Sequence, residues 1–302
     1  MKTLVIFGCG YVGTALALQA LRRGYRVTAL TRNASKAASL RKAGVHQTVE
    51  ADLDAADWHK QISSHYDYGL NCVSSAGSGL AGYRKSYLNG QRSIAAWARD
   101  GRIGTFVYTS STSVYPQVSK VIVDEETSTK GISEAGSILL AAEEALITAG
   151  ACFDRWFILR LAGIYGPRRH FLLDQLRDGV SVMSGDGAVF LNMVHLDDIC
   201  SAIWAALEAS PHRANRIYNV VDDLPSTKGD IVNWMAQQLH RPPPNFLSKA
   251  PQGISRRRVR LDGRMPDRRV SNRRIKTELQ WHLRYPDFKR GYSALLKSHT
   301  LQ

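Results

Sequence analysis

The chain has 302 residues, of which 44% are hydrophobic and 22% charged. This composition is typical of folded globular proteins and excludes a disordered or fibrous chain, and the length allows about two domains of roughly 150 residues each. Lysine and arginine outnumber aspartate and glutamate by 40 to 26, a net charge of +14. Ten basic and two acidic residues lie between Arg256 and Lys276. This clustering favours a local polyanionic partner over a basic surface everywhere.

The four cysteines lie far apart and include no C-x-x-C pair. This spacing argues against a zinc site and a disulfide framework, and it predicts buried thiols in a reducing cytoplasm. No apolar run reaches the ~18 residues of a membrane span. The stretch from Thr3 to Leu18 imitates a signal peptide, but Gly8, Gly10 and Gly13 interrupt its apolar pattern.

Strand and helix patterns alternate along the first half of the chain. The predicted strands are Leu4–Phe7, Arg26–Leu30, Gln47–Glu50, Gly69–Ser74, Thr105–Thr109 and Phe153–Arg160. The predicted helices are Val12–Arg23, Ser35–Ala43, Asp54–Ser63, Tyr83–Arg99 and Ser133–Ala149. This alternation predicts an α/β fold, a doubly wound parallel sheet with helices on both faces.

The alternation stops after Gly166. The later predicted elements are helices Phe171–Arg177 and Leu196–Ala209, a strand at Arg216–Val221, and a helix after Pro225 on which Thr227 and Asp230 have the spacing of a capping box. We therefore expect residues 1–166, with 191–222 returning to them, to form a dinucleotide-binding domain. Residues 167–190 and 223–302 are expected to form a smaller α/β substrate domain.

The first predicted strand and helix are joined by the pattern G-x-G-x-x-G. In such a turn Gly8 permits the tight bend, Gly10 lets a pyrophosphate approach the backbone, and Gly13 lets helix and strand pack closely. Phosphates bind the N–H groups at a helix N-terminus, so Tyr11 and Val12 are also candidate cofactor-binding residues. A glycine-rich packing turn is the alternative interpretation.

The end of the second strand bears on the choice of cofactor. An NAD site normally places an acidic residue there to bind the ribose hydroxyls, whereas this chain has Thr31 and Arg32. A guanidinium can bind a 2′-phosphate that a carboxylate would repel, so NADP is favoured over NAD. Arg32 as a solvated loop residue, with both cofactors binding, is the alternative. Asp52 and Leu53, after the third strand, are expected to flank the adenine, unless Asp52 only caps a helix.

Five further motifs accompany the glycine turn. They are TSSTSVY at 109–115, RLAGIYGP at 160–167, VHLDD at 194–198, RVSN at 269–272 and RYP at 284–286. Together these segments resemble the extended and atypical short-chain dehydrogenase/reductases, the group that includes NAD-dependent epimerase/dehydratases of nucleotide sugars. The resemblance covers most of the chain. It implies a nucleotide-binding Rossmann fold and oxidoreductase or epimerase chemistry.

The resemblance also assigns candidate roles to single residues. Ser111 matches the family's active-site serine, which donates a hydrogen bond to the reacting oxygen; a serine that only satisfies loop backbone groups is the alternative. Ser74, Ser75 and Ala76 follow the fourth strand, where the family contacts its cofactor. A plain exit from the strand is the alternative for these three.

The family's proton-transfer pair, Y-x-x-x-K, is absent. Its two positions correspond to Ala135 and Leu139, and residues 133–149 include neither tyrosine nor lysine. Either another group transfers the proton, or the nucleotide is bound without turnover. Candidate replacements, on loops at the strand C-termini where ligands bind in such sheets, are Tyr115, Tyr165 and His170. A buried tyrosine is otherwise a core residue with a satisfied hydroxyl.

Two charged clusters remain. In the resembled family the arginine-rich region faces the cleft and holds the diphosphate of a nucleotide-linked sugar, which makes Arg268 and Arg269 candidate substrate ligands; a solvated basic face is the alternative. The segment has no interleaved aromatic residues, so nucleic acid is not expected as a partner. His195, Asp197 and Asp198 at a helix start indicate capping rather than a metal site.

The resemblance further implies a possible homodimer through the helices at 83–99 and 133–149. The residues expected at that interface, unless they face the sheet, are Leu88, Ile94, Trp97, Ile138, Ala142 and Leu146. Two functions stay open. One is a cytoplasmic NAD(P)-dependent oxidoreductase or epimerase/dehydratase-like enzyme on a nucleotide sugar or similar phosphorylated substrate, with a non-standard acid or base. The other is a non-catalytic NADP(H)-binding sensor or regulatory protein.

Overall fold

The computed structural model describes residues 1–75, 77, 79–213, 215–247 and 267–299. The chain forms two compact units. Unit 1 comprises Met1–Val114, Glu134–Arg160 and Cys200–Tyr218, and unit 2 comprises Tyr115–Ser133, Leu161–Ile199 and Asn219–Gln302. The expected division placed 115–133, 161–166, 191–199 and 219–222 in the first domain, and all four stretches lie in unit 2. The stretch 115–133 does so because it contains β6 (Ile122–Val123), which pairs with β15 (Arg269–Val270).

Unit 1 is built around a seven-stranded parallel sheet of order β12-β7-β5-β4-β1-β2-β3. Its strands are β1 (Thr3–Phe7), β2 (Arg26–Thr31), β3 (Gln47–Glu50), β4 (His65–Asn71), β5 (Arg102–Ser111), β7 (Phe153–Leu161) and β12 (Arg216–Val220). The predicted α/β class, a doubly wound parallel sheet, is confirmed. Because β1 pairs with both β2 and β4, the strand order reverses beside β1, and ligands bind at such switch points.

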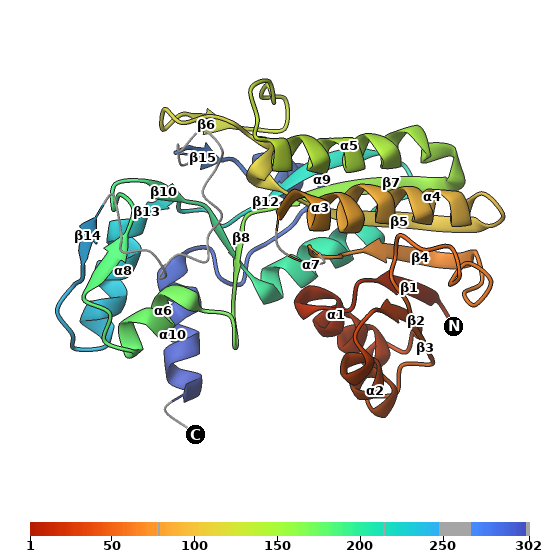
Figure 1. Cartoon of the computed structure of the whole chain (residues 1–302), viewed down its shortest axis with the longest axis horizontal. Coiled ribbons are helices and arrows are strands. Elements are labelled where there is room, and N and C mark those ends of the chain that lie inside the picture. Colours follow the sequence, from red (N-terminus) through yellow and green to blue (C-terminus); the bar gives the residue numbers. More distant parts are fainter. Residues whose placement is uncertain (76, 78, 214, 248–266, 300–302) are drawn as a thin grey trace. The chain divides into compact units, whose positions relative to one another are not determined.

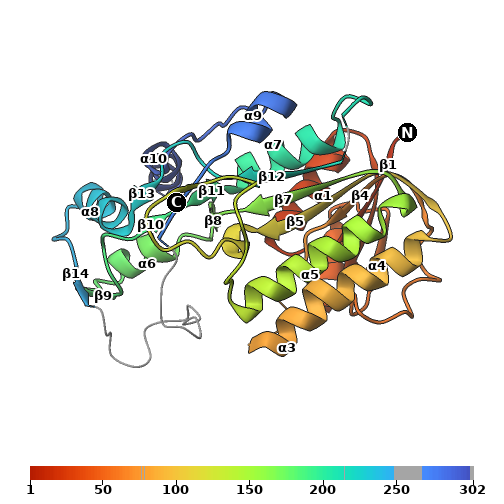
Figure 2. The same cartoon turned by 90° about the horizontal axis from the view of Figure 1, so that it is seen from above.

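Helices cover both faces of this sheet. They are α1 (Tyr11–Arg22), α2 (Ala34–Lys42), α3 (Gly79–Tyr83), the π-helix η1 (Arg84–Asn89), α4 (Gly90–Ala98), α5 (Glu134–Thr148) and α7 (Leu196–Leu207). Figures 1 and 2 show α4 and α5 on one face and α1 and α7 on the other. Under α4 the rings of Phe7, Trp58 and Trp97 pack with centroids 5.2 to 5.6 Å apart.

The predicted helix at Asp54–Ser63 is wrong, because this stretch forms successive tight turns. Most of its backbone bonds span three residues, as in His59 N–H to the Ala56 carbonyl, and one, Ile62 N–H to the Trp58 carbonyl, spans four. Trp58 is fully buried, and its indole N–H donates to the Leu53 carbonyl. Burial of this ring in the core overrides the helical pattern.

The helices α4 and α5 turn their large apolar side chains inward. Those expected at a dimer interface are 0 to 4% exposed within a single chain: Leu88, Ile94, Trp97, Ile138, Ala142 and Leu146. Four of them, Ile94, Trp97, Ala142 and Leu146, belong to the core cluster beneath these helices. The expectation that they form an interface is therefore corrected, and the alternative, that they face the sheet, is what the structure shows.

Unit 2 contains shorter elements. They are β6, β8 (Gly163–Tyr165), α6 (Phe171–Arg177), β9 (Val182–Ser184), β10 (Phe190–Leu191), β11 (Met193–His195), β13 (Ser226–Thr227), α8 (Lys228–Gln238), β14 (Asn245–Leu247), β15, α9 (Arg273–Leu279) and α10 (Phe288–His299). The short helix η2 (Thr112–Val114) ends the first segment of unit 1. The predicted capping box is confirmed: Thr227 accepts from the Asp230 N–H, and Asp230 accepts from that of Thr227. Most of the arginine-rich segment, 256–266, lies outside the described residues.

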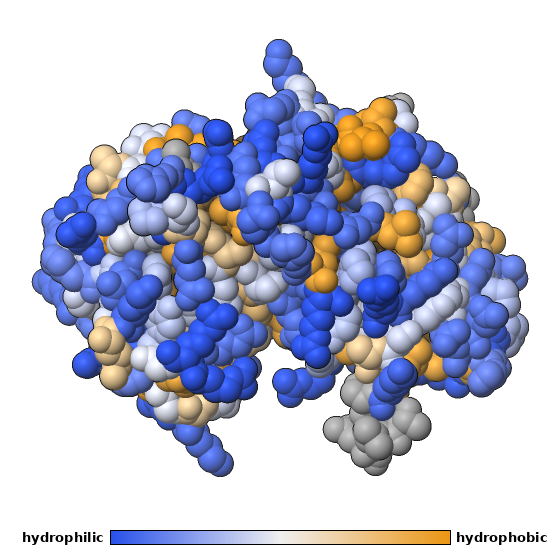
Figure 3. Space-filling view, turned by 180° about the vertical axis from the view of Figure 1, so that it is seen from behind, coloured by the Kyte–Doolittle hydropathy of each residue, from blue (hydrophilic) through white to orange (hydrophobic). Residues whose placement is uncertain are grey.

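The described surface is mainly hydrophilic on the face in Figure 3, with apolar residues in small groups. Scattered apolar residues are ordinary at a protein surface. Among the described residues no helix is long and apolar enough to cross a membrane. All four cysteines are free thiols; Cys9, Cys72 and Cys200 are buried, and Cys152 is partly exposed.

Candidate functional site

The turn between β1 and α1 requires glycine at two positions. Gly8 has φ +91°, and a Cβ there would lie 2.7 Å from Val73 Cα; a Cβ on Gly13 would lie 2.5 Å from the Gly8 carbonyl oxygen. A Cβ on Gly10 would meet nothing within 4 Å. Gly10 is also the N-cap of α1 and brings no side chain to the terminus. This open N-terminus fits the pyrophosphate of a dinucleotide.

A cavity of about 240 Å³ lies beside this turn, entirely within unit 1. The predicted cofactor residues that line it are Gly8, Gly10, Arg32, Asp52, Leu53 and Ser74. Three others, Tyr11, Val12 and Gly13, form the first turn of α1. The Ser75 hydroxyl donates to the Gly77 carbonyl, and Ala76 lies outside the described residues.

The charged lining of this cavity is mixed. Arg32 and Lys36 come from the end of β2 and the first turn of α2, and Lys85 comes from η1. Lys85 Nζ lies 2.8 Å from Asp52 Oδ2 and 3.8 Å from Asp54 Oδ1. The hydrogen bond to Asp52 and the charge of Asp54 raise the pKa of Lys85. Together these groups form a polar rim with three cations and two carboxylates.

Sequence reasoning missed Lys36 and Lys85. A signal for Lys36 exists, because Asn33 is the N-cap of α2 and its side chain accepts from the Lys36 N–H at 2.9 Å. An N-x-x-K pattern after a strand places the lysine in the first helical turn. Lys85 has no such local signal, since it meets Asp52 across 33 residues of sequence.

Ser111 ends β5 and is partly exposed. Its hydroxyl donates to Ser113 Oγ at 3.0 Å and accepts from the Ser113 N–H at 3.1 Å. These contacts stabilise the short helix η2. The serine hydroxyl therefore satisfies a backbone N–H group of the loop. Ser111 also lies at the C-terminal end of a strand, where ligands bind in this class of sheet.

The helix α5 lacks the proton-transfer pair and has a different polar contact. Leu139 is buried, whereas Ala135 is only partly so. One turn further, Glu143 accepts from the Ser110 hydroxyl at 2.6 Å and from Arg160 Nη2 at 2.7 Å. All three side chains are buried. A buried ion pair with this geometry holds α5 to the sheet.

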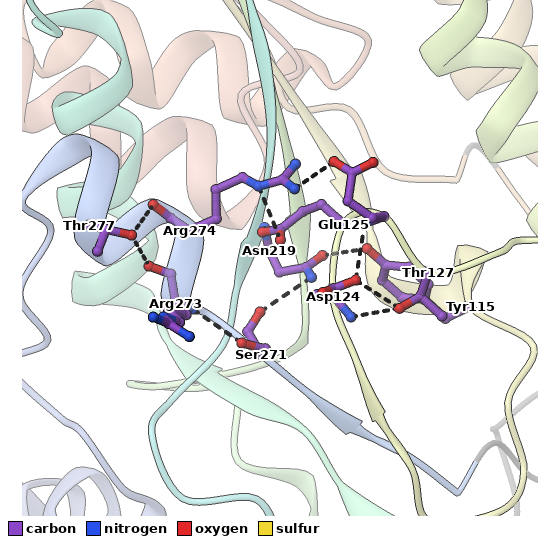
Figure 4. A network of polar contacts seen from close by, with 10 residues as sticks. Tyr115, Asp124, Glu125, Thr127, Asn219, Ser271, Arg273, Arg274 and Thr277 are labelled. Carbon is purple, nitrogen blue, oxygen red and sulfur yellow. Dashed lines mark hydrogen bonds and ion pairs between the residues drawn. The ribbon is translucent and has the colours of Figure 1, made fainter.

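Tyr115 is fully buried in unit 2. Figure 4 shows its hydroxyl at Asn219, where it donates to Oδ1 at 2.9 Å. The Asn219 N–H donates to Glu125 Oε1 at 2.7 Å, and Arg274 Nε lies 3.6 Å from the same carboxylate. Burial raises the pKa of Glu125. The Tyr115 hydroxyl thus has a structural hydrogen bond, as the alternative interpretation of a buried tyrosine expects, although the sequence did not identify its partner.

Tyr165 lies in the core of unit 2 and is 1% exposed. Its ring stacks on Tyr292 at 4.8 Å and meets His195 edge-on at 5.2 Å. Burial, with the charge of Asp222 as the next cause, raises the pKa of Tyr165. This environment opposes ionisation of the phenol.

His170 precedes α6, and its Nδ1 lies 2.7 Å from Asp174 Oδ1. The Asp197 N–H donates to His195 Nδ1. Asp198 accepts from the N–H groups of Arg284 and Tyr285. The His195 contact at the start of α7 fits the expected capping, whereas Asp198 binds backbone far along the chain, at residues 284–285.

Residues 4–220 match the NAD dependent epimerase/dehydratase family. The chain belongs to this family. The resemblance found in the motifs is therefore confirmed. Family membership gives the chain an enzyme-like, oxidoreductase or epimerase-like role with an NAD-type cofactor.

Relatives extend over nearly the whole chain. Protein YeeZ of Escherichia coli K12 is 28% identical over 293 residues, 95% of this chain and 97% of that protein. A 2-alkyl-3-oxoalkanoate reductase of Stenotrophomonas maltophilia is 29% identical over 269 residues, 80% and 77% of the two chains. A UDP-glucuronic acid 4-epimerase from Bacillus cereus, solved with UDP-glucuronic acid and NAD, has a TM-score of 0.80 at 19% identity and 97% coverage of both chains. At that identity the likeness shows the fold.

The two arginines predicted to bind the substrate, Arg268 and Arg269, lie in unit 2. Arg268 is 5% exposed. Arg269 is half-buried; its Nε donates to the Lys120 carbonyl, and its guanidinium lies 5.6 Å from the ring of Phe190. Arg269 is therefore held in place by unit 2 itself.

Proposed function

We propose that the protein is an NADP(H)-dependent oxidoreductase that binds the adenosine half of its cofactor in the cavity of unit 1. The observation that carries this proposal is the charge at the end of β2, where Arg32 lines the cavity and Lys36 follows in the first turn of α2. The first turn of α2 has no acidic residue. An anionic group bound there gains from two cations and a helix N-terminus.

Within this proposal the glycine turn holds the pyrophosphate, through the N-terminus of α1 that Gly10 leaves open. Leu53 and Asp52 flank the adenine, and Arg32 binds the 2′-phosphate. When bound, the nicotinamide supplies or accepts a hydride. Ser111 donates a hydrogen bond to the oxygen of the reacting carbonyl or alcohol, which requires the Ser111 hydroxyl to turn away from Ser113.

The proposed substrate is a small molecule with a phosphorylated group. A nucleotide sugar is the first class of compound to test. The basic segment supports this choice, since guanidinium pairs with phosphate in a forked geometry. Within the part of the basic segment that the structure describes, Arg268 and Arg269 are the candidates for that contact. The likeness to a 2-alkyl-3-oxoalkanoate reductase supports a β-keto compound as the other substrate class to test.

The missing tyrosine and lysine favour a second candidate function, a non-catalytic NADP(H) sensor. General acid–base catalysis contributes about 10²–10⁴-fold. The Tyr115 hydroxyl is committed to Asn219, and Tyr165 lies in the core, so neither restores that contribution in this arrangement. We expect tight NADPH binding with slow turnover on ordinary alcohols, ketones and aldehydes.

The two units have separate proposed roles: unit 1 binds the dinucleotide, and unit 2 binds the substrate.

We also propose a two-fold dimer through the outer faces of α4 and α5. The exposed charges there are Arg92, Arg99 and Glu144, which line one groove with small residues between them. Opposite charges on one surface can pair across a two-fold axis.

The cofactor choice is tested by titrating purified protein with NADPH and NADH. Arg32→Ala is expected to weaken NADPH binding by about ten- to a hundredfold, the range for charged hydrogen bonds, and to leave NADH nearly unchanged. Arg41→Ala, an exposed arginine in the last turn of α2, is the matched control. Equal losses for both cofactors in Arg32→Ala, or wild-type protein that binds both equally, would overturn the proposal.

A further inference from the structure

The rim of the unit 1 cavity contains a lysine, Lys85, that the cofactor assignment does not use. Lys85 lies on η1, and Asp52 and Asp54 lie on the turn after β3. Lys85 contacts both carboxylates, at 2.8 and 3.8 Å. All three side chains line the cavity that also contains Arg32.

The backbone that presents Lys85 is unusual. Residues Arg84–Asn89 form a six-residue π-helix between α3 and α4. Such turns are rare and occur often at functional sites. Within η1 both Lys85 and Ser86 line the cavity. The wide turn therefore places a lysine at the rim where the sequence pattern predicted a regular helix.

The charges at the rim decide what the cavity can accept. Arg32, Lys36 and Lys85 carry three positive charges, and Asp52 and Asp54 carry two negative ones. Arg32 lies close enough to Lys85 to oppose the rise in the Lys85 pKa. Removal of Lys85 would leave both carboxylates unpaired beside any anion bound by Arg32. Unpaired like charges repel a phosphate dianion much more than a neutral ribose hydroxyl.

We infer that Lys85 is a specificity-determining residue, which neutralises Asp52 and Asp54 and thereby lets the cavity accept a 2′-phosphorylated adenosine ribose. The inference rests on the proposed binding of NADP(H) in this cavity. In this role Lys85 neutralises the two carboxylates and does not itself contact the phosphate. Asp52 can then flank the adenine in either cofactor, while Lys85 controls the preference between them.

The ion pair is expected to contribute little to the stability of the fold. Lys85 and Asp52 are each 43% exposed, and exposed pairs contribute little to folding. A change at Lys85 is therefore expected to leave the melting temperature nearly unchanged. An effect on cofactor preference would then report on electrostatics at the cavity.

The experiment measures dissociation constants of NADPH and NADH for wild type, Lys85→Met, Asp52→Asn and the double variant. Lys85→Met is expected to weaken NADPH binding about fivefold, the size that Coulomb's law in water gives for one charge about 8 Å from a phosphate dianion. NADH binding should change less than twofold. Asp52→Asn removes one negative charge from the same rim, so the double variant should recover a preference within about twofold of wild type. At 0.5 M salt all these differences should shrink, because screening is then nearly complete at that distance.

Lys42→Met removes the same charge at the far end of α2, where Lys42 is exposed, and serves as the control. If Lys85→Met changes both cofactors equally or matches Lys42→Met, or if the double variant keeps the altered preference of Lys85→Met alone, the inference is overturned. Those outcomes leave the NADPH preference of the wild type intact. Wild-type protein without that preference would instead overturn the proposed cofactor, and the role of Lys85 with it.

Discussion

Arg160 and Glu143 form a buried ion pair in unit 1, with Nη2 2.7 Å from Oε2, and the Ser110 hydroxyl donates to the same carboxylate. The two charged side chains are 6% and 3% exposed. Ser110 is on β5, Arg160 on β7 and Glu143 on α5. The pair therefore fixes the helix on which the family normally has its tyrosine and lysine.

Glu143→Gln should destabilise the fold strongly. It leaves the Arg160 guanidinium buried without a counter-charge, which costs about 3–5 kcal/mol of unfolding free energy. Glu144→Gln, one residue along on the exposed side of α5, is expected to change it by less than about 0.5 kcal/mol. Urea unfolding followed by circular dichroism measures both. Similar midpoints for the two variants would show that the buried pair is dispensable.

The sequence predicts unit 1 well because its signals are local. The strand Leu4–Phe7, the glycine turn and the helix after it each follow from residues within one turn of one another, and the capping box of Thr227 and Asp230 is equally local. The wrong helix at Asp54–Ser63 depends on burial of Trp58, a tertiary effect. Periodicity alone does not distinguish a helix from successive turns with one buried ring.

The candidate site shows the same limit. Arg32 can be predicted from its place at the end of a strand, whereas Lys85 meets Asp52 only once η1 and β3 are folded. The Tyr115 hydroxyl finds Asn219 across 104 residues. A motif indicates which side chain is present at the end of a strand. It does not indicate which distant residue forms a hydrogen bond or ion pair with that side chain.

Asp222 should make unit 2 less stable as the pH rises. Burial, and then the charges of Asp223 and Asp287, raise its pKa from 3.8 to about 8. A raised folded-state pKa stabilises the fold below pH 3.8, and this contribution is lost as the pH rises through about 8. The shift corresponds to at most about 6 kcal/mol.

Asp222→Asn tests this effect, because asparagine keeps the shape and cannot ionise. The variant should melt several degrees above wild type at pH 9, and the difference should shrink toward pH 4. Asp178→Asn is the control, since Asp178 is exposed at the C-terminal end of α6 and is not one of the charges that raise the pKa of Asp222. A difference from wild type that does not vary between pH 4 and pH 9 would assign no titration to Asp222.

The proposed dimer can be tested on the outer face of α4. Arg92→Glu with Arg99→Glu reverses two exposed charges beside Glu144 and should convert a dimer to a monomer of 33.5 kDa. Light scattering at micromolar concentration measures the mass. Arg22→Glu, in the last turn of α1 on the other face of the sheet, should leave the mass unchanged. A wild-type mass of 33.5 kDa would reject the dimer itself.

Ser111→Ala tests the proposed chemistry once a substrate has been found among nucleotide sugars and β-keto compounds. A hydroxyl that stabilises the reacting oxygen should contribute to kcat, so we expect a loss of about 10²-fold, comparable to that for an oxyanion donor, with NADPH affinity changed less than twofold. Ser113→Ala is the matched control, because it removes the Oγ contact between the two serines and keeps the Ser111 hydroxyl. Ser113→Ala should retain most of the activity. If kcat falls equally in both variants, the lost contact within the turn explains the effect, and Ser111 has no direct role in the reaction. If kcat falls in neither variant, the reacting oxygen does not bind at Ser111.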